Sequence, residues 1–124
     1  MEDKIIKAAM EILIHAGDAR LANNEILIAI ANQEFDKIDE KMEKAQAEIM
    51  AAHHIHTDII QKDSAGEGKM EYSLLFSHAE DTLMTVSSEI NITKQLIKIF
   101  KSYEKRIAAL EEFVERMSVH EKDE

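Results

Sequence analysis

The sequence predicts an all-α fold, with three long antiparallel helices packed as one bundle in each subunit. Two observations favour it: the 124-residue chain holds no proline and only three glycines, and its apolar residues recur at steps of three and four. Proline and glycine are the poorest helix formers, and apolar residues at this spacing fall on one face of a helix. A chain of this length suits a single helical domain, residues 1–124.

The helix boundaries follow from turn residues and from changes in the apolar pattern. Gly17 permits a kink or a short break in the first helix, which would place His15 near a helix end. The stretch NQEFD marks a turn, and KDSAGEGKM, the only segment rich in glycine and small polar residues, marks a loop. Helices are therefore expected at about residues 3–31, 35–63 and 70–102. A further helical stretch at 103–118 either continues the third helix or bends away from it, and a loop at 64–69 and a charged tail at 119–124 complete the chain.

Apolar residues cover more of these helices than packing within one chain requires. Leu27 and Ile28 add apolar surface beside the stripe of the first helix, and the third helix carries a heptad-like seam. A helix of ~30 residues spans roughly 45 Å, so much apolar surface would stay uncovered in a monomer, and self-association is expected. The seam of the third helix consists of Phe76, Ala79, Leu83, Val86 and Ile90.

Composition excludes several classes of function. The formal net charge is −10 and no run of Lys or Arg forms a basic patch, so a nucleic-acid partner is not expected. The absence of cysteine removes disulfides, thiol nucleophiles and thiolate metal sites. The amino-terminal residues are acidic and amphipathic, unlike a signal peptide, and no stretch approaches ~20 apolar residues. A cytoplasmic location is therefore expected.

The stretch LLFSHAEDTLMT, residues 74–85, places polar groups beside the seam of the third helix. His78, Asp81, Thr82 and Thr85 share one side of this helix, and no Lys or Arg occurs between Met70 and Lys94. In one interpretation His78 and Asp81 are an ordinary exposed pair, three residues apart. In the other, His78 lies in a cleft between helices, where a neutral imidazole is a good nucleophile.

Asp81 suggests a cation site if this helix lies nearest the axis of a homotrimer. Three Asp81 carboxylates would then converge and would need a cation, and oxygen ligands suit Mg²⁺. The stretch AAHHIHTDII offers His53 and His54 as weaker candidates for structural roles, metal binding or phosphate contact. No third zinc ligand is evident there, and SAGEGKM lacks the spacing of a phosphate-binding loop.

Three stretches in order resemble one known family: HAGDAR, AHHIHTDIIQKDSAGE and LLFSHAEDTLMT. They are similar to the IIA component of the lactose/cellobiose/chitobiose class of the bacterial phosphoenolpyruvate-dependent sugar phosphotransferase system. The resemblance implies a homotrimer of nine main helices. It also implies that His78 accepts a phosphoryl group from phospho-HPr and passes it to the IIB component, which serves the IIC permease. Asp81 would bind a divalent metal ion, such as Mg²⁺, at the trimer axis.

The sequence departs from the family pattern at three positions. Glu80 replaces a glutamine, Thr82 replaces a second histidine and His56 replaces another glutamine. Ser77, Glu80 and Thr82, with His53 and His54, remain candidate supporting residues, and hydroxyls such as Ser77 or Thr82 are candidate donors to the phosphoryl group. Two alternatives stay open: a trimeric scaffold that merely binds an ion, and a regulatory relative that binds partners without phosphoryl transfer.

Overall fold

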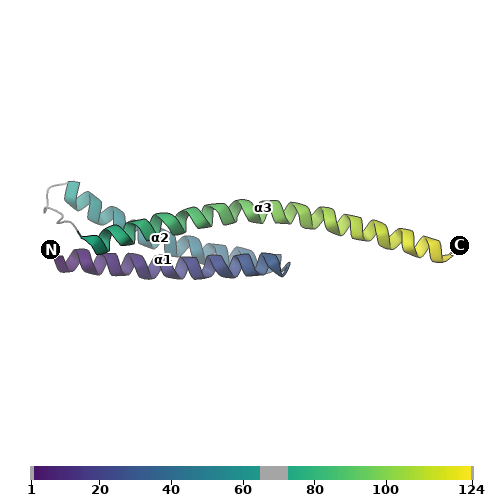
Figure 1. The fold of residues 1–124 in the computed structure, drawn as a ribbon, viewed down its shortest axis with the longest axis horizontal. Helices are drawn as coiled ribbons and strands as arrows, with labels where there is room; N and C mark the ends of the chain where they lie inside the picture. Colours follow the sequence, from purple (N-terminus) through teal and green to yellow (C-terminus); the bar gives the residue numbers. More distant parts are fainter. Residues whose placement is uncertain (1, 65–72, 124) are drawn as a thin grey trace. The chain divides into compact units, whose positions relative to one another are not determined.

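The structure is a computed structural model that describes residues 2–64 and 73–123, and in these ranges it is helical with no strand. The all-α prediction is therefore confirmed. Figure 1 shows the long helices of the chain. The elements are α1 (Glu2–Ala31), a 3₁₀ helix η1 (Phe35–Lys37), α2 (Ile38–Ser64) and α3 (Leu74–Asp123). The chain forms two compact units, Met1–Thr93 and Lys94–Glu124, and the boundary between them falls within α3.

The α1 helix ends without a glycine. Gln33 adopts a φ of 60°, in the left-handed region. The Glu34 amide donates to the Ala29 carbonyl at 2.8 Å, and the Gln33 amide donates to the Ile30 carbonyl at 3.0 Å. These two bonds form a Schellman motif, which satisfies the last carbonyls of the helix. The chain thereby reverses into η1 and α2, so α1 and α2 pack antiparallel (Figure 1).

Two interruptions that the sequence permits are absent from the described helices. The α1 helix runs through Gly17 without a break, so His15 lies within the helix rather than at its end. The stretch expected at 103–118 belongs to the same helix as the third segment, since α3 is continuous over 50 residues, and helix also includes most of the expected tail. No proline interrupts either helix, and a single glycine in a helix costs only about 1 kcal/mol relative to alanine.

The α3 helix begins later than the expected residue 70. Ser73 is not helical, and its hydroxyl accepts a hydrogen bond from the Phe76 amide at 3.2 Å. This is an N-cap, in which a serine oxygen satisfies an amide that has no partner within the helix. The expected loop at 64–69 lies almost entirely outside the described residues.

The unit formed by residues 1–93 has a core of small and branched apolar side chains, contributed by α1, α2 and the first part of α3. The expected seam of α3 is buried, with Ala79, Leu83 and Val86 fully inaccessible. Many core residues are alanines, which allow helices to approach closely. Two clusters make up this core: Ile5, Ala9, Ile12, Ala52, Phe76, Ala79 and Leu83, and then Ala16, Ala19, Ala22, Ala45, Val86 and Ile90.

The α1 helix also carries a stripe of exposed apolar side chains on the face away from this core. Ile14, Leu21 and Ile28 are 59%, 58% and 60% exposed, and Ile6 and Met10 continue the stripe toward the amino terminus. These positions recur at steps of four and seven, so they share one side of the helix. The expectation of surplus apolar surface is therefore confirmed. No described helix is long and apolar enough to cross a membrane.

Candidate functional site

His78 and Asp81 lie on an exposed face of α3, beside the buried seam. Both side chains are exposed, as are Thr85 and Ser88, while their neighbours Ala79 and Leu83 are fully buried. The sequence predicted that His78, Asp81 and Thr85 share one side of this helix, and in the structure these three side chains are exposed to solvent. Because α3 is anchored by its seam, the backbone beneath His78 is fixed by packing.

The two threonine hydroxyls on this face bond to the helix backbone. Thr82 Oγ1 donates to the His78 carbonyl at 2.9 Å, and Thr85 Oγ1 donates to the Asp81 carbonyl at 2.8 Å. In this conformation the hydroxyl hydrogen of Thr82 is engaged and is not directed at an incoming phosphoryl group. None of the described residues hydrogen-bonds to the His78 ring or pairs with the Asp81 carboxylate. Both groups are therefore available to a partner.

Glu80, the acidic neighbour of Asp81, is held against α2. His56 Nε2 lies 2.8 Å from Glu80 Oε2, and the His56 ring stacks on Phe76 with centroids 5.8 Å apart and an interplanar angle of 7°. The His56 side chain is only 16% exposed, so this contact belongs to the α2–α3 interface. The ion pair or hydrogen bond offsets part of the negative charge that Glu80 brings to the polar face.

The other two histidines of α2, His53 and His54, form no hydrogen bond with His78. His53 Nε2 lies 3.3 Å from Ser87 Oγ across the α2–α3 interface, and His54 is exposed on another side of α2. His53 and His56 share a face, as their spacing predicts, but they contact different residues of α3. Within residues 2–64 and 73–123, no group of three or more His, Cys, Asp or Glu side chains is placed to hold a metal ion. Ser77 is partly buried on α3.

Three further contacts, which periodicity did not reveal, fix α1 beside α2 and α3. Arg20 donates two hydrogen bonds to Glu89, at 3.1 and 2.8 Å, and the pKa of Arg20 is raised by this bonding. His15 Nδ1 lies 2.6 Å from Glu48 Oε2. Lys41 bonds to Glu25 at 2.8 Å and lowers the pKa of that carboxyl. Such pairs join residues far apart in sequence, so only the folded chain brings them together.

Comparison with known proteins identifies the family. Residues 7–101 match the model of the "PTS system, Lactose/Cellobiose specific IIA subunit". The oligo-beta-mannoside-specific EIIA component of Bacillus subtilis is 36% identical over 94 residues, which cover 76% of this chain and 84% of that protein. The lactose-specific EIIA component of Lacticaseibacillus casei is 36% identical over 100 residues, covering 81% and 88%.

A solved structure agrees with this match. The PTS cellobiose-specific enzyme IIA from Bacillus anthracis is 31% identical and superposes with a TM-score of 0.75, over 80% of this chain and 90% of that one. The family match ends at residue 101, within α3. The chain therefore belongs to the lactose/cellobiose-specific IIA family and is a phosphotransferase component of a sugar uptake system.

Proposed function

We propose that this chain is a phosphocarrier, in which His78 accepts a phosphoryl group from phospho-HPr and passes it to the IIB component. The observation that supports this role is the placement of His78. Its ring is exposed, has no hydrogen-bond partner among the described residues, and stands on a helix whose adjacent seam is buried. A side chain that must meet two different protein partners in turn needs this combination of access and rigid support.

Phosphoryl transfer requires the chain mainly to position the His78 ring correctly. The lone pair of one His78 ring nitrogen attacks the phosphorus in line, and the other ring nitrogen carries the proton. As the new N–P bond forms, the N–P bond of the donor histidine breaks and its electron pair returns to the donor ring. Transfer of this kind depends mainly on positioning and charge stabilisation. The remote nitrogen, Nε2, is the better nucleophile here because it projects furthest from the backbone.

We further propose that the chain works as a homotrimer in which Asp81 from each copy faces the axis. The Asp81 carboxylate is exposed and unpaired within the described part of the chain, and one copy supplies only one such ligand. Three copies would supply a set of oxygen ligands that fits a hard divalent cation such as Mg²⁺. The bound cation would offset the mutual repulsion of these carboxylates. The exposed apolar stripe of α1 supports self-association.

Thermal melting tests the role of Asp81 separately from activity. We expect the melting temperature of the wild type to rise in MgCl₂ relative to EDTA, because a cation that binds only the folded assembly stabilises it by about 2.7 kcal/mol at 100 times its Kd. Asp81→Asn should lose this response, whereas Asp18→Asn, another exposed aspartate, should keep it. An equal Mg²⁺ response in Asp81→Asn, or a monomer in sedimentation, would contradict the proposal.

A phosphoryl relay tests the carrier function itself. The wild type is incubated with phosphoenolpyruvate, the general phosphotransferase enzyme and HPr, and its intact mass is measured before and after the IIB component is added. We expect one acid-labile phosphoryl group per chain, which is lost when IIB is present. A folded chain that binds HPr but gains no phosphoryl group, while the same HPr phosphorylates another IIA, would favour the regulatory alternative instead.

A further inference from the structure

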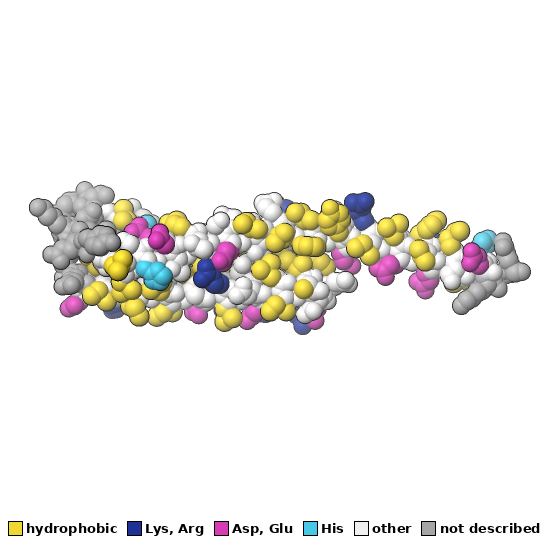
Figure 2. Space-filling view, viewed as in Figure 1, with side chains coloured by type: hydrophobic (Ala, Val, Ile, Leu, Met, Phe, Trp, Pro, Cys, Tyr) yellow, Lys and Arg dark blue, Asp and Glu magenta, His cyan; other side chains and the backbone are white. Residues whose placement is uncertain are grey.

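The carboxyl-terminal part of α3, residues Lys94–Asp123, displays an apolar seam along one side of the helix. Every residue from Lys98 to Glu121 is exposed, including large side chains such as Ile107 and Leu110, which are 55% and 63% accessible. In Figure 2, apolar side chains run along one side of this segment. The family match stops at residue 101, so most of this seam is additional to the family domain.

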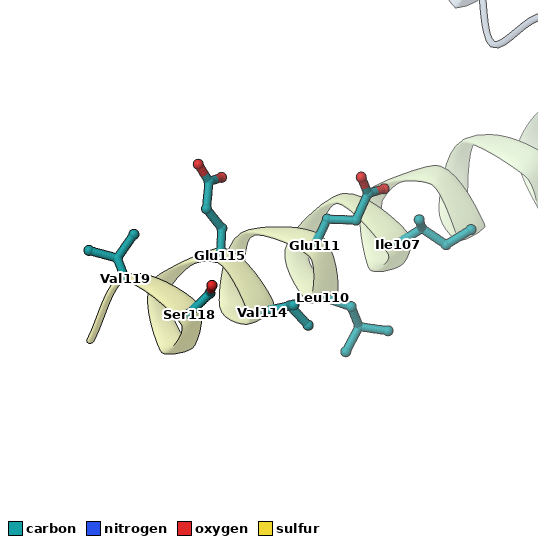
Figure 3. A pocket seen from close by; sticks show the side chains of 7 residues that line it. All are labelled: Ile107, Leu110, Glu111, Val114, Glu115, Ser118 and Val119. Atoms are coloured by element: carbon teal, nitrogen blue, oxygen red, sulfur yellow. The ribbon is translucent and has the colours of Figure 1, made fainter. Parts of the chain in front are cut away.

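The seam follows a heptad repeat. Its members are spaced alternately three and four residues apart, which is the pattern of the a and d positions of a coiled coil. Figure 3 shows Leu110 and Val114 projecting from one side of the helix, while Glu111 and Glu115 project from another. In heptad notation the a positions are Phe100, Ile107 and Val114, and the d positions are Leu96, Tyr103, Leu110 and Met117.

Charges beside the seam fix the orientation of a matching helix. Arg106 occupies a g position, and Glu111 occupies the e position five residues later; no ion pair between the described residues uses either one. In a parallel, in-register coiled coil the g residue of one helix meets the following e residue of its neighbour. Arg106 would then pair with Glu111. An antiparallel arrangement would instead place the e residues Glu104 and Glu111 close together, where like charges repel.

We propose that residues 94–123 pack against the same segment of further copies of this chain, as a parallel, in-register coiled coil. The repeat supplies the apolar contact, and the Arg106–Glu111 complementarity selects a second copy over an unrelated partner. Ile99 and Phe113 occupy g positions and widen the apolar face. The inference rests on this segment alone and does not depend on phosphoryl transfer at His78.

Disulfide trapping in the full-length chain tests the arrangement directly, because the protein has no native cysteine. Tyr103→Cys and Met117→Cys are made as separate single variants and are oxidised mildly with oxidised glutathione. Both are expected to give a covalent dimer on a non-reducing gel, because identical d positions meet in a parallel, in-register coil. The matched control is Ala109→Cys, a c position that faces away from the seam and should stay largely monomeric on the same gel.

The possible outcomes separate the alternatives. If neither Tyr103→Cys nor Met117→Cys forms a dimer, but Tyr103→Cys mixed with Val114→Cys does, the helices are antiparallel, because d positions then face a positions, and the proposal is wrong. If no combination forms a dimer while sedimentation still shows an oligomer, residues 1–93 assemble without this segment, and the proposal is also wrong. The result would then favour a different partner for the seam.

A charge exchange provides a second, independent test in the Tyr103→Cys background. Arg106→Glu and Glu111→Arg should each slow disulfide formation several-fold, because each places like charges at the g–e contact. The double exchange should restore the wild-type rate, since it re-forms the pair with opposite polarity. If disulfide formation in the double variant is slowed by the combined effect of the two single changes, Arg106 and Glu111 are not interhelical partners.

Discussion

Replacing His78 with glutamine is expected to abolish phosphoryl acceptance while leaving the fold intact. Glutamine keeps hydrogen-bonding groups at this position but has no nucleophilic nitrogen. The loss should be at least about 10³-fold in the rate of phosphorylation by phospho-HPr, the scale of removing a nucleophile. Stability should change by no more than about 0.5 kcal/mol, because the His78 side chain is exposed and bonded to none of the described residues.

The matched control is His54→Gln, an exposed histidine on α2. We expect this variant to be phosphorylated at the wild-type rate. The rates are measured by intact mass over time at limiting HPr, and stability is measured by urea unfolding of the same samples. Retention of phosphorylation in His78→Gln, or its loss in His54→Gln, would assign the acceptor to a different residue.

Truncating Leu83 is expected to cause the largest loss of stability among single changes near the site. Leu83 is fully buried in the cluster that also holds Phe76 and Ala79. Leucine-to-alanine changes in cores cost about 2 to 5 kcal/mol, because apolar contact is lost and a cavity remains. Leu83→Ala should therefore lower the free energy of unfolding by about 3 kcal/mol.

Met84→Ala is the control for this change, because Met84 is the next residue of the same helix and is 47% exposed. It should alter the free energy of unfolding by no more than about 0.5 kcal/mol. Both variants are measured by urea unfolding at equal chain concentration, since self-association would make stability depend on concentration. A similar loss in the two variants would contradict the assignment of the seam as the core side of α3.

The helices and the two sides of α3 were predictable because they depend on local periodicity. Residues 76, 79, 83, 86 and 90 are buried as their spacing requires, and His78 and Asp81 fall on the adjacent exposed side. The polar stretch NQEFD correctly predicted where α1 ends. The Schellman motif at that end could not be predicted, because Gln33 rather than a glycine adopts the left-handed conformation. Gly17 permitted a kink, but α1 runs through it unbroken, as the predicted range 3–31 has it, because the packing of α1 outweighs the low helix propensity of glycine.

The contacts between helices were beyond prediction from the sequence. The pairs Arg20–Glu89 and His15–Glu48 join residues that only the packing of α1 against α3 and α2 brings together. The His56–Glu80 contact also changes the meaning of two departures from the family pattern. The family pattern has a glutamine at position 56 and another at position 80. This chain has His56 and Glu80 instead, and the two side chains bond to each other. The two replacements are therefore complementary, and Glu80 faces α2 with a partner.

The most direct test of His78 as the acceptor is to locate the phosphoryl group on the chain. Trypsin releases residues 70–94 as one peptide, because no Lys or Arg lies between Lys69 and Lys94, and His78 is its sole histidine. After phosphorylation by phospho-HPr, digestion and mass spectrometry at alkaline pH should find the added phosphoryl group on this peptide. A phosphoryl group on the peptide that holds His53, His54 and His56, or on neither peptide of a phosphorylated chain, would contradict the proposed mechanism.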